Sequence, residues 1–348
     1  MNTEPSDDPP FFSVVIPTYN RCEMLRAALA SVRNQTFADY EVIVVDSLSD
    51  DGTEEMMAGL EQPIRYIREK NGGPGPARNI GIAAAKGTYI AFLDSDDLWF
   101  PWTLETYHAV IQKENSPAFL TGKPRIFEDE KDLDDVEQGT PQLRSDKTGI
   151  EERTNGIMRS KEPHSCEPAT YPSAIQDKPS YNAFADYLAS GDAWRWFGVS
   201  SFVVRADALR AAGGFDPRGL NAEDADLALR LGTAPGFVEL TAPVQFAYRA
   251  HDANLTKNET QNLAGLRAIL DRESAGEFPG GNARRRERRR IITRHLRPVA
   301  LACLRARQFA DAWNLYAASF LWHMAEARFR FIAAFPLRFA AALATGRS

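Results

Sequence analysis

The chain of 348 residues has little cysteine and no long apolar run. Its three cysteines, Cys22, Cys166 and Cys303, lie far apart and form no CxxC pair. This spacing excludes a disulfide framework and a cysteine zinc site, and it indicates a reducing compartment. No stretch approaches the ~20 apolar residues that a membrane-spanning helix needs. The acidic, proline-rich start, MNTEPSDDPP, is unlike a signal or transit peptide, so we expect a cytoplasmic protein.

The C-terminal region lacks lysine and has few acids. Residues 282–348 contain 14 arginines and three acids, a net charge of +11, whereas the rest of the chain has a net charge of -17. Such asymmetry predicts an acidic body and a basic tail with different roles. We therefore divide the chain into a disordered N-terminus (1–10), a body domain (11–270) with an insertion at about 128–180 that is poor in apolar residues, and a basic amphipathic helical tail (271–348).

Short apolar runs alternate with stretches of helical periodicity. In the first hundred residues we expect strands at 11–17, 40–46, 64–68 and 89–93, and helices at about 22–35, from 53, and at 77–85. After the insertion we expect helices at 181–188, 206–212 and 222–231, and strands at 201–205, 237–240 and 244–249. This alternation predicts the α/β class, with a doubly wound, mostly parallel sheet and flanking helices.

Polar clusters follow three of the predicted strands. Thr18 ends the first, Asp46 ends the second, and Asp94 follows the fourth. Ligands of such sheets bind beyond the carboxyl ends of the strands, so we expect a site at this edge. The glycine-rich NGGPGPARN has neither the third glycine of a dinucleotide fingerprint nor the GK[ST] of a P-loop.

Asp94-Ser95-Asp96 is the candidate metal site. Two carboxylates on a loop after a buried strand can hold one hard cation, such as Mg²⁺ or Mn²⁺, together with the oxygens of a substrate diphosphate. The alternative is that Asp96 or Asp97 only caps a helix starting near Leu98.

Asp224 is the candidate general base. On a helix over 222–231, the positions three, four and seven residues after Asp224 are apolar, so its carboxylate faces inward. A buried carboxylate is costly unless it is used or paired, which suits a base. We expect Asp226 and Arg230 to pair on the solvent side, and Glu223 only to complement the helix dipole.

Two further side chains can bind an anion or a metal. Arg78 lies in the first turn of its predicted helix, where a phosphate would bind, although a surface salt bridge explains it equally well. His251 follows a strand and is a candidate metal or diphosphate ligand, or else an ordinary loop histidine.

Six motifs occur in a characteristic order: VVIPTYNR (14–21), VIVVDSLSDDGT (42–53), NGGPGPARNIGIAAAKGTYIAFLDSDD (71–97), GGFD (213–216), EDADLALRL (223–231) and YRAH (248–251). Together they resemble family 2 glycosyltransferases with the GT-A fold, over about residues 12–256. One departure is that Ser47 and Leu48 occupy the positions of the family's second acid and glycine after Asp46.

The resemblance implies transfer of a sugar from a nucleoside diphosphate donor to an acceptor hydroxyl, with inversion. It implies Asp224 as the catalytic base. The implied nucleotide and donor contacts are Pro17, Thr18, Tyr19, Asp46, Arg78, Asp94 and Ser95. The implied metal contacts, for Mn²⁺ or Mg²⁺, are Asp94, Asp96 and His251. The sugar pocket is expected from residues 194–197 and the insertion.

The resemblance also bears on partners. A UDP-sugar is the most frequent donor in the family, and a cell-surface glycan or a lipid-linked molecule is the expected acceptor. The alternative is a catalytically silent protein of the same fold that binds nucleotide sugars. For the tail, peripheral contact with the inner face of the cytoplasmic membrane and a helical hairpin packed on the body both stay open. No nucleic-acid partner is expected, because no recognised motif accompanies the charge.

Overall fold

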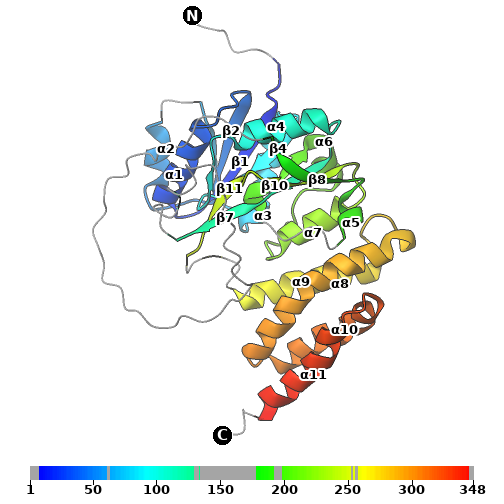
Figure 1. Ribbon diagram of the computed structural model, residues 1–348. Coiled ribbons are helices and arrows are strands. Elements are labelled where there is room, and N and C mark those ends of the chain that lie inside the picture. Colours follow the sequence, from blue (N-terminus) through cyan, green and yellow to red (C-terminus); the bar gives the residue numbers. More distant parts are fainter. Residues whose placement is uncertain are drawn as a thin grey trace, which may run out of the picture.

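A computed structural model describes residues 8–60, 63–128, 133, 178–191, 198–251, 254 and 258–344 (Figure 1). The predicted sugar-pocket residues 194–197 and nearly all of the predicted insertion lie outside these residues. The proposed domain boundaries therefore stay a prediction.

An eight-stranded sheet forms the centre of the body. Its strands, in spatial order, are β3 (Arg65–Arg68), β2 (Tyr40–Asp46), β1 (Phe12–Thr18), β4 (Tyr89–Phe92), β9 (Val203–Arg205), β6 (Phe119–Gly122), β10 (Phe237–Ala242) and β8 (Ser180–Phe184). Only β9 and β8 run antiparallel to their neighbours. The predicted mostly parallel sheet is confirmed.

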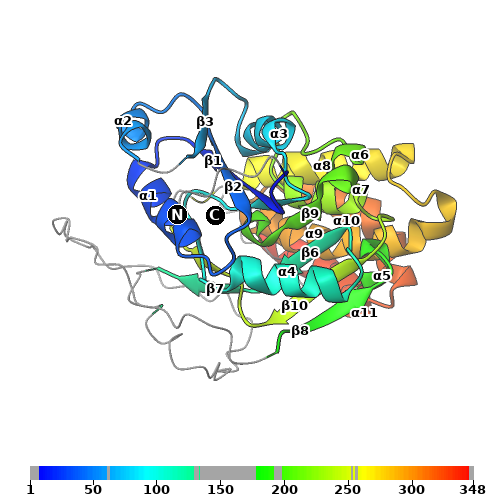
Figure 2. The same ribbon diagram turned by 90° about the horizontal axis from the view of Figure 1, so that it is seen from above.

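Strand side chains alternate between two apolar layers, as the period of two requires. Val15 and Ile43 pack into one layer, whereas Val14 and Val42 pack into the other. The first layer is covered by α3 (Pro74–Ala84), α6 (Ala206–Ala211) and α7 (Glu223–Arg230), and the second by α1 (Cys22–Arg33), α2 (Thr53–Ala58) and α4 (Thr103–Lys113). Figure 2 shows α3 and α4 on opposite sides of the sheet.

A second, three-stranded sheet lies beside the site. It contains β5 (Leu98–Trp99), β11 (Phe246–Arg249) and β7 (Pro124–Phe127), with β11 in the middle. The amide of Arg249 donates to Asp97 Oδ1 at 3.1 Å, so this sheet is joined to the loop after β4.

The C-terminal part is helical: α8 (Glu259–Ala275), α9 (Arg285–Arg305), α10 (Phe309–Ala325) and α11 (Phe329–Ala344). Short helices lie at Tyr187–Ser190 (α5), Val199–Ser201 and Asn282–Arg284. Ile291 and Leu296 of α9 belong to the same apolar layer as the sheet. The packed arrangement that the sequence left open therefore holds for α9. No helix in the described ranges combines the length and apolar character needed to cross a bilayer.

Three local predictions were wrong. The expected helix over 181–188 is strand β8 followed by the short α5, because the backbone of 180–184 pairs with β10 at the sheet edge. The helix expected near Leu98 begins only at Thr103, since β5 pairs with β11 first. The apolar spacing from Phe309 to Phe331 predicts one helical stretch, but this part of the tail contains two helices, α10 and α11. The chain reverses between them at Ala327, which has a left-handed φ of 51°.

Candidate active site

The carboxyl ends of β1, β2 and β4 meet at one edge of the large sheet. Thr18 is in register with Asp46, and Asp94 follows β4 on the other side of β1. The three polar clusters that the sequence placed at strand ends therefore lie together, as the topology requires.

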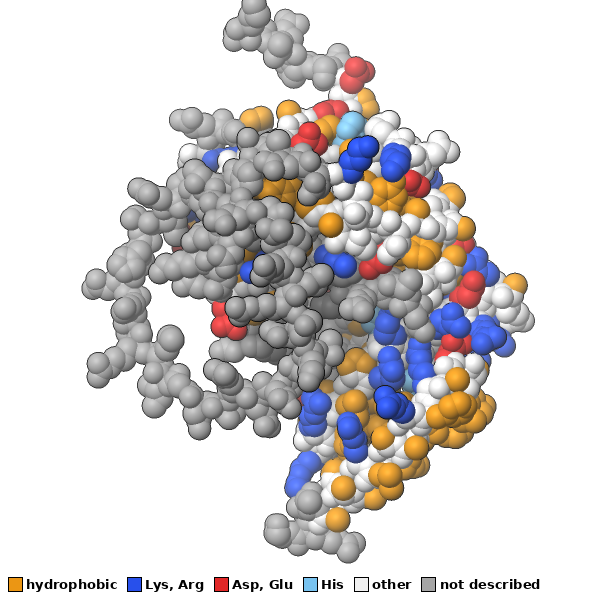
Figure 3. All heavy atoms as spheres, in the orientation of Figure 1, with side chains coloured by type: hydrophobic (Ala, Val, Ile, Leu, Met, Phe, Trp, Pro, Cys, Tyr) orange, Lys and Arg blue, Asp and Glu red, His pale blue; other side chains and the backbone are white. Residues whose placement is uncertain are grey.

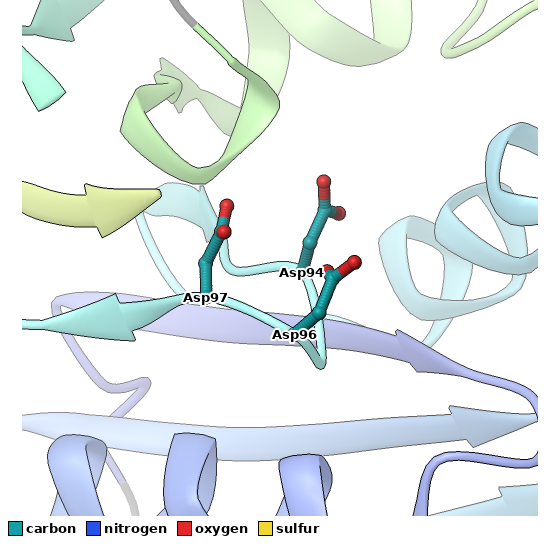
Figure 4. Close-up of side chains that lie close together, drawn as sticks. All are labelled: Asp94, Asp96 and Asp97. Atoms are coloured by element: carbon teal, nitrogen blue, oxygen red, sulfur yellow. The ribbon is translucent and has the colours of Figure 1, made fainter. Parts of the chain in front are cut away.

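Asp94, Asp96 and Asp97 form an acidic cluster on the loop after β4. One carboxylate oxygen from each lies within 4.8 Å of the others, and Figure 4 shows the three side chains rising from the same loop. Burial, with the charges of Asp96 and Asp94, raises the pKa of Asp97 well above its usual value. A cation would relieve the mutual repulsion of these carboxylates.

The hydrogen bonds give the three acids different roles. Asp97 accepts from Ser200 Oγ at 2.6 Å and from the Arg249 amide, so both its oxygens brace the loop. Asp94 Oδ2 and Asp96 Oδ1 accept no hydrogen bond from the described residues. These two hard oxygen donors fit Mg²⁺ or Mn²⁺.

Asp96 has two basic neighbours. Arg21 Nη1 lies 2.7 Å from Asp96 Oδ2, and His251 Nε2 lies 2.9 Å from the same oxygen. The structure thus brings His251 to the acidic cluster from the end of β11, as expected of a candidate ligand. Arg21 was missed, although it ends the motif VVIPTYNR.

Arg78 is the buried centre of an ion-pair network. Its guanidinium binds both Asp94 and Glu223 and lies 5.1 Å from the centroid of the Phe215 ring. Although burial lowers it, the charges of Asp94 and Glu223 raise the pKa of Arg78 above its usual value. Neither of the two interpretations offered from sequence, a free anion site or a surface salt bridge, describes this network.

The prediction that Glu223 only complements the helix dipole was wrong. Its Oε1 pairs with Arg78, while its buried Oε2 has no hydrogen-bond partner in the described part of the chain and lies over the backbone of Gly75. Burial raises the pKa of Glu223 to about 7, against the lowering by Arg78. No sequence signal identified this role, because Arg78 and Glu223 are 145 residues apart.

Asp224 is buried, as its position on α7 predicted, with 8% of its surface exposed. Its Oδ1 accepts the amide of Ala225 at 2.7 Å, and its charge contributes, after burial, to a raised pKa of Tyr187. Asp226 and Arg230 pair at 2.8 Å as expected, but not on the solvent side. Helix α8 covers them, and Arg272 Nε lies 3.5 Å from Asp226 Oδ1.

The nucleotide-side residues divide into buried and open ones. Asp46 is fully buried and accepts from the Ser49 amide at 3.1 Å and from Tyr66 Oη at 2.7 Å. Burial, then this bond to Asp46, raises the pKa of Tyr66. Tyr19, by contrast, is 61% exposed and can offer its ring to a base.

Three other predicted contacts are buried. Pro17 and Ser95 pack into the edge of the sheet, and the hydroxyl of Thr18 is buried without a hydrogen-bond partner among the described residues. Leu48, at the family's glycine position, has a left-handed φ of 60°.

Comparisons with known proteins agree with this geometry. Residues 13–164 match the model for glycosyl transferase family 2. The chain is 39% identical over 130 residues to an uncharacterized glycosyltransferase of Rickettsia bellii, covering 37% of this chain and 19% of that relative. It is 47% identical over 96 residues to the succinoglycan biosynthesis protein ExoW of Rhizobium meliloti, covering 26% and 30%. The chain thus spans less than a third of the length of either relative.

The fold is similar to that of S. aureus TarS, in its crystal structure with UDP-GlcNAc. The TM-score is 0.55 at 17% identity, covering 82% of this chain and 71% of that one. Residues 13–164 therefore match glycosyl transferase family 2, and the fold of the chain is similar to that of GT-A transferases.

Proposed function

We propose that the protein is an inverting, metal-dependent glycosyltransferase that moves a sugar from a nucleoside diphosphate sugar to an acceptor hydroxyl. The observation that supports this proposal is that two kinds of carboxylate, the candidate metal ligands and the candidate base on α7, are held at one edge of the sheet. Asp94 and Asp96 each present an oxygen that accepts no hydrogen bond from the described residues. Helix α7 is linked to them from Asp94 through Arg78 to Glu223.

The donor half of the reaction needs binding and charge neutralisation. Asp94 and Asp96 would hold Mn²⁺ or Mg²⁺, with His251 next to them, and the metal would supply positive charge to the departing diphosphate. Tyr19 and the buried end of β1, with Pro17 and Thr18, would contact the base and ribose. TarS binds UDP-GlcNAc according to its structure, and we propose a UDP-sugar as donor here.

The acceptor half needs a base. In a single displacement the acceptor oxygen attacks the anomeric carbon, the bond to the diphosphate breaks, and the acceptor proton moves to a carboxylate. Glu223 is committed to Arg78, so we assign the proton to the carboxylate of Asp224. A positioned base contributes about 10²–10⁴-fold to such a rate.

The acceptor is proposed to be a cell-surface glycan or a lipid-linked molecule, handled at the inner face of the cytoplasmic membrane. ExoW, a protein of succinoglycan biosynthesis, supports polysaccharide synthesis as the setting.

Binding and transfer test the proposal separately. Thermal unfolding is followed against a panel of nucleoside diphosphates, with and without Mn²⁺. Saturation at a hundredfold excess over Kd stabilises a protein by ~2.7 kcal/mol. We expect a metal-dependent shift with UDP that Asp96→Asn removes and Asp207→Asn, a substitution on the exposed surface of α6, leaves unchanged.

Donor hydrolysis and transfer are then measured for Asp224→Asn. We expect unchanged UDP binding and a loss of turnover by about 10²-fold or more. Full turnover in this variant would remove Asp224 from the mechanism. UDP binding without hydrolysis or transfer by the unaltered protein would favour the silent nucleotide-sugar-binding alternative.

A further inference from the structure

The exposed apolar side chains of this protein are concentrated on its last two helices. Nine large apolar side chains are exposed among the described residues, and six of them lie on α10 and α11. The six are Trp313, Leu321, Met324, Phe329, Leu337 and Leu343. A soluble surface seldom gathers apolar residues in this way unless something covers them.

These residues form one face and not a scatter. At 100° per residue, Trp313, Leu321 and Met324 fall on one side of α10, and the other three fall on one side of α11. Between the helices lies a shallow apolar hollow lined by Phe309, Ala310, Trp313, Pro336 and Phe339. Figure 3 shows hydrophobic side chains gathered over this end of the molecule, with arginines beside them.

The charges near this face have one sign. Its two acids are already neutralised, because Asp311 pairs with Arg267, and Glu326 pairs with both Arg286 and Arg290. Arg330 and Arg338 of α11 are exposed and have no ion-pair or hydrogen-bond partner within the described ranges. At 100° per residue, Arg330 lies about 20° from Leu337 around α11 and Arg338 about 100° from it, so both arginines lie along one edge of the apolar face.

The arginine-rich run at the start of α9 is used differently. Arg284 binds both oxygens of Asp186 at 2.8 Å, and Arg288 is buried and lies 2.7 Å from Glu273 Oε2. Arg289 also pairs with Glu273, at 3.1 Å. Arg284 thus joins the start of α9 to the body, and Arg288 and Arg289 join α9 to α8, so most of the charge of RRRERRR is compensated within the protein.

We propose that the face formed by α10 and α11 binds an anionic membrane surface, with the apolar side chains entering the headgroup region and Arg330 and Arg338 contacting lipid phosphates. Helices with an apolar face flanked by arginines bind in the plane of the membrane in this way. The inference deepens the membrane location given under the proposed function and rests on it, but it needs no transfer activity.

The positive charge of Arg330 and Arg338 makes a membrane a better partner for this face than a second copy of the chain. Two copies meeting through this face would bring Arg330 and Arg338 of each copy against those of the other, with both nearby acids already paired. Anionic headgroups complement the same arginines and leave the apolar stripe in a medium that accepts it.

Flotation of the full chain with vesicles tests the proposal. We expect binding to phosphatidylcholine vesicles that contain phosphatidylglycerol and much weaker binding to phosphatidylcholine alone, with a further decrease at high salt. Leu321→Glu and Leu337→Glu should each weaken binding about tenfold. Ile126→Glu, a matched exposed apolar position on β7, should not.

Charge variants separate the two basic regions. Arg330→Gln and Arg338→Gln should each weaken binding about fivefold, the effect of one cation at an anionic surface. Arg284→Gln removes the same charge from the ion-paired run, at a residue that pairs with Asp186 and not with Glu326, and should change binding little. Thermal unfolding and UDP binding of each variant show whether the body is intact, so a failed membrane surface is distinguishable from a failed transferase assignment.

Three results would overturn the proposal. One is the absence of binding to either kind of vesicle. Another is an equal loss of binding in Ile126→Glu and Leu337→Glu. The third is a dimer in solution that Leu337→Glu converts to a monomer, which would give this face to a second copy.

Discussion

Arg78 and Glu223 form a buried ion pair that joins the second turn of α3 to the first turn of α7. Arg78 also binds Asp94, so one guanidinium connects the candidate metal loop to the helix that carries Asp224. The distance between the two proposed halves of the reaction is therefore set by a side chain that contacts both. We regard Arg78 as a positioning residue.

Loss of this guanidinium should be costly. Arg78→Met leaves the carboxylates of Glu223 and Asp94 without their partner in a buried site, and we expect the free energy of unfolding to fall by about 3–5 kcal/mol. Urea unfolding measures the change. Arg26→Met breaks the exposed pair with Glu23 and should cost less than about 1 kcal/mol. Equal losses in the two variants would contradict a buried network.

Stability should decrease with pH across the titration of Glu223. Burial raises its pKa to about 7 from an ordinary 4.5, so between these values the folded protein keeps a proton that the unfolded chain has released. The free energy of unfolding therefore falls as pH rises from about 4.5 to about 7, by ~3 kcal/mol at most from this group. Urea unfolding over a pH series should show this decline, reduced in Glu223→Gln. A parallel decline in both proteins would assign the effect to other groups.

The sequence predicted the parallel half of the sheet well, because each of its first strands is a β-branched run with a clear end. The prediction failed where pairing with a distant strand, and not the intrinsic helix or strand propensity of the residues, decides the secondary structure. Residues 181–188 have helical composition, yet 180–184 pair as an edge strand with β10, a partner more than 50 residues away. Likewise, Leu98 lies in strand β5 and not at the start of a helix, because β5 pairs with the distant strand β11.

Leu48 should be a strained position. Its φ of 60° is one that branched side chains avoid and glycine adopts freely. We expect Leu48→Gly to raise the free energy of unfolding by about 1 kcal/mol, because the left-handed conformation costs about that for an L-residue. Leu48→Ala keeps the strain and should bring no such gain. Thermal unfolding compares the two, and a destabilised glycine variant would contradict the prediction.

The packing of α9 against α8 should depend on Arg288 and Glu273. Both are buried, so Arg288→Met leaves an uncompensated carboxylate and should lower the free energy of unfolding by about 3–5 kcal/mol. Adding Glu273→Leu removes that carboxylate and should restore much of the loss. Urea unfolding with tryptophan fluorescence follows both variants. If the double variant were no more stable than the single one, packing and not charge would explain the cost.

A residue of the candidate site could be predicted from the sequence only where its position within its own strand or helix is enough to place it. Asp94, Asp96 and Asp46 follow their strands directly, and the inward position of Asp224 follows from helical periodicity. The partners of these acids could not be predicted, because each comes from a distant element. Arg21 reaches Asp96 across 75 residues and His251 across 155, while Arg78 reaches Glu223 across 145.

Ser200 shows what this long-range assembly means for the first half of the chain. Its hydroxyl donates to Asp97 Oδ2 at 2.6 Å and accepts from the Asp94 amide at 3.0 Å, and the strand after it, β9, separates β4 from β6. A fragment ending at residue 164 would carry every aspartate of the acidic cluster but neither the brace of their loop nor the strand between two central ones. The segment that matches the family model therefore depends on later residues to hold its acidic loop and to complete its sheet.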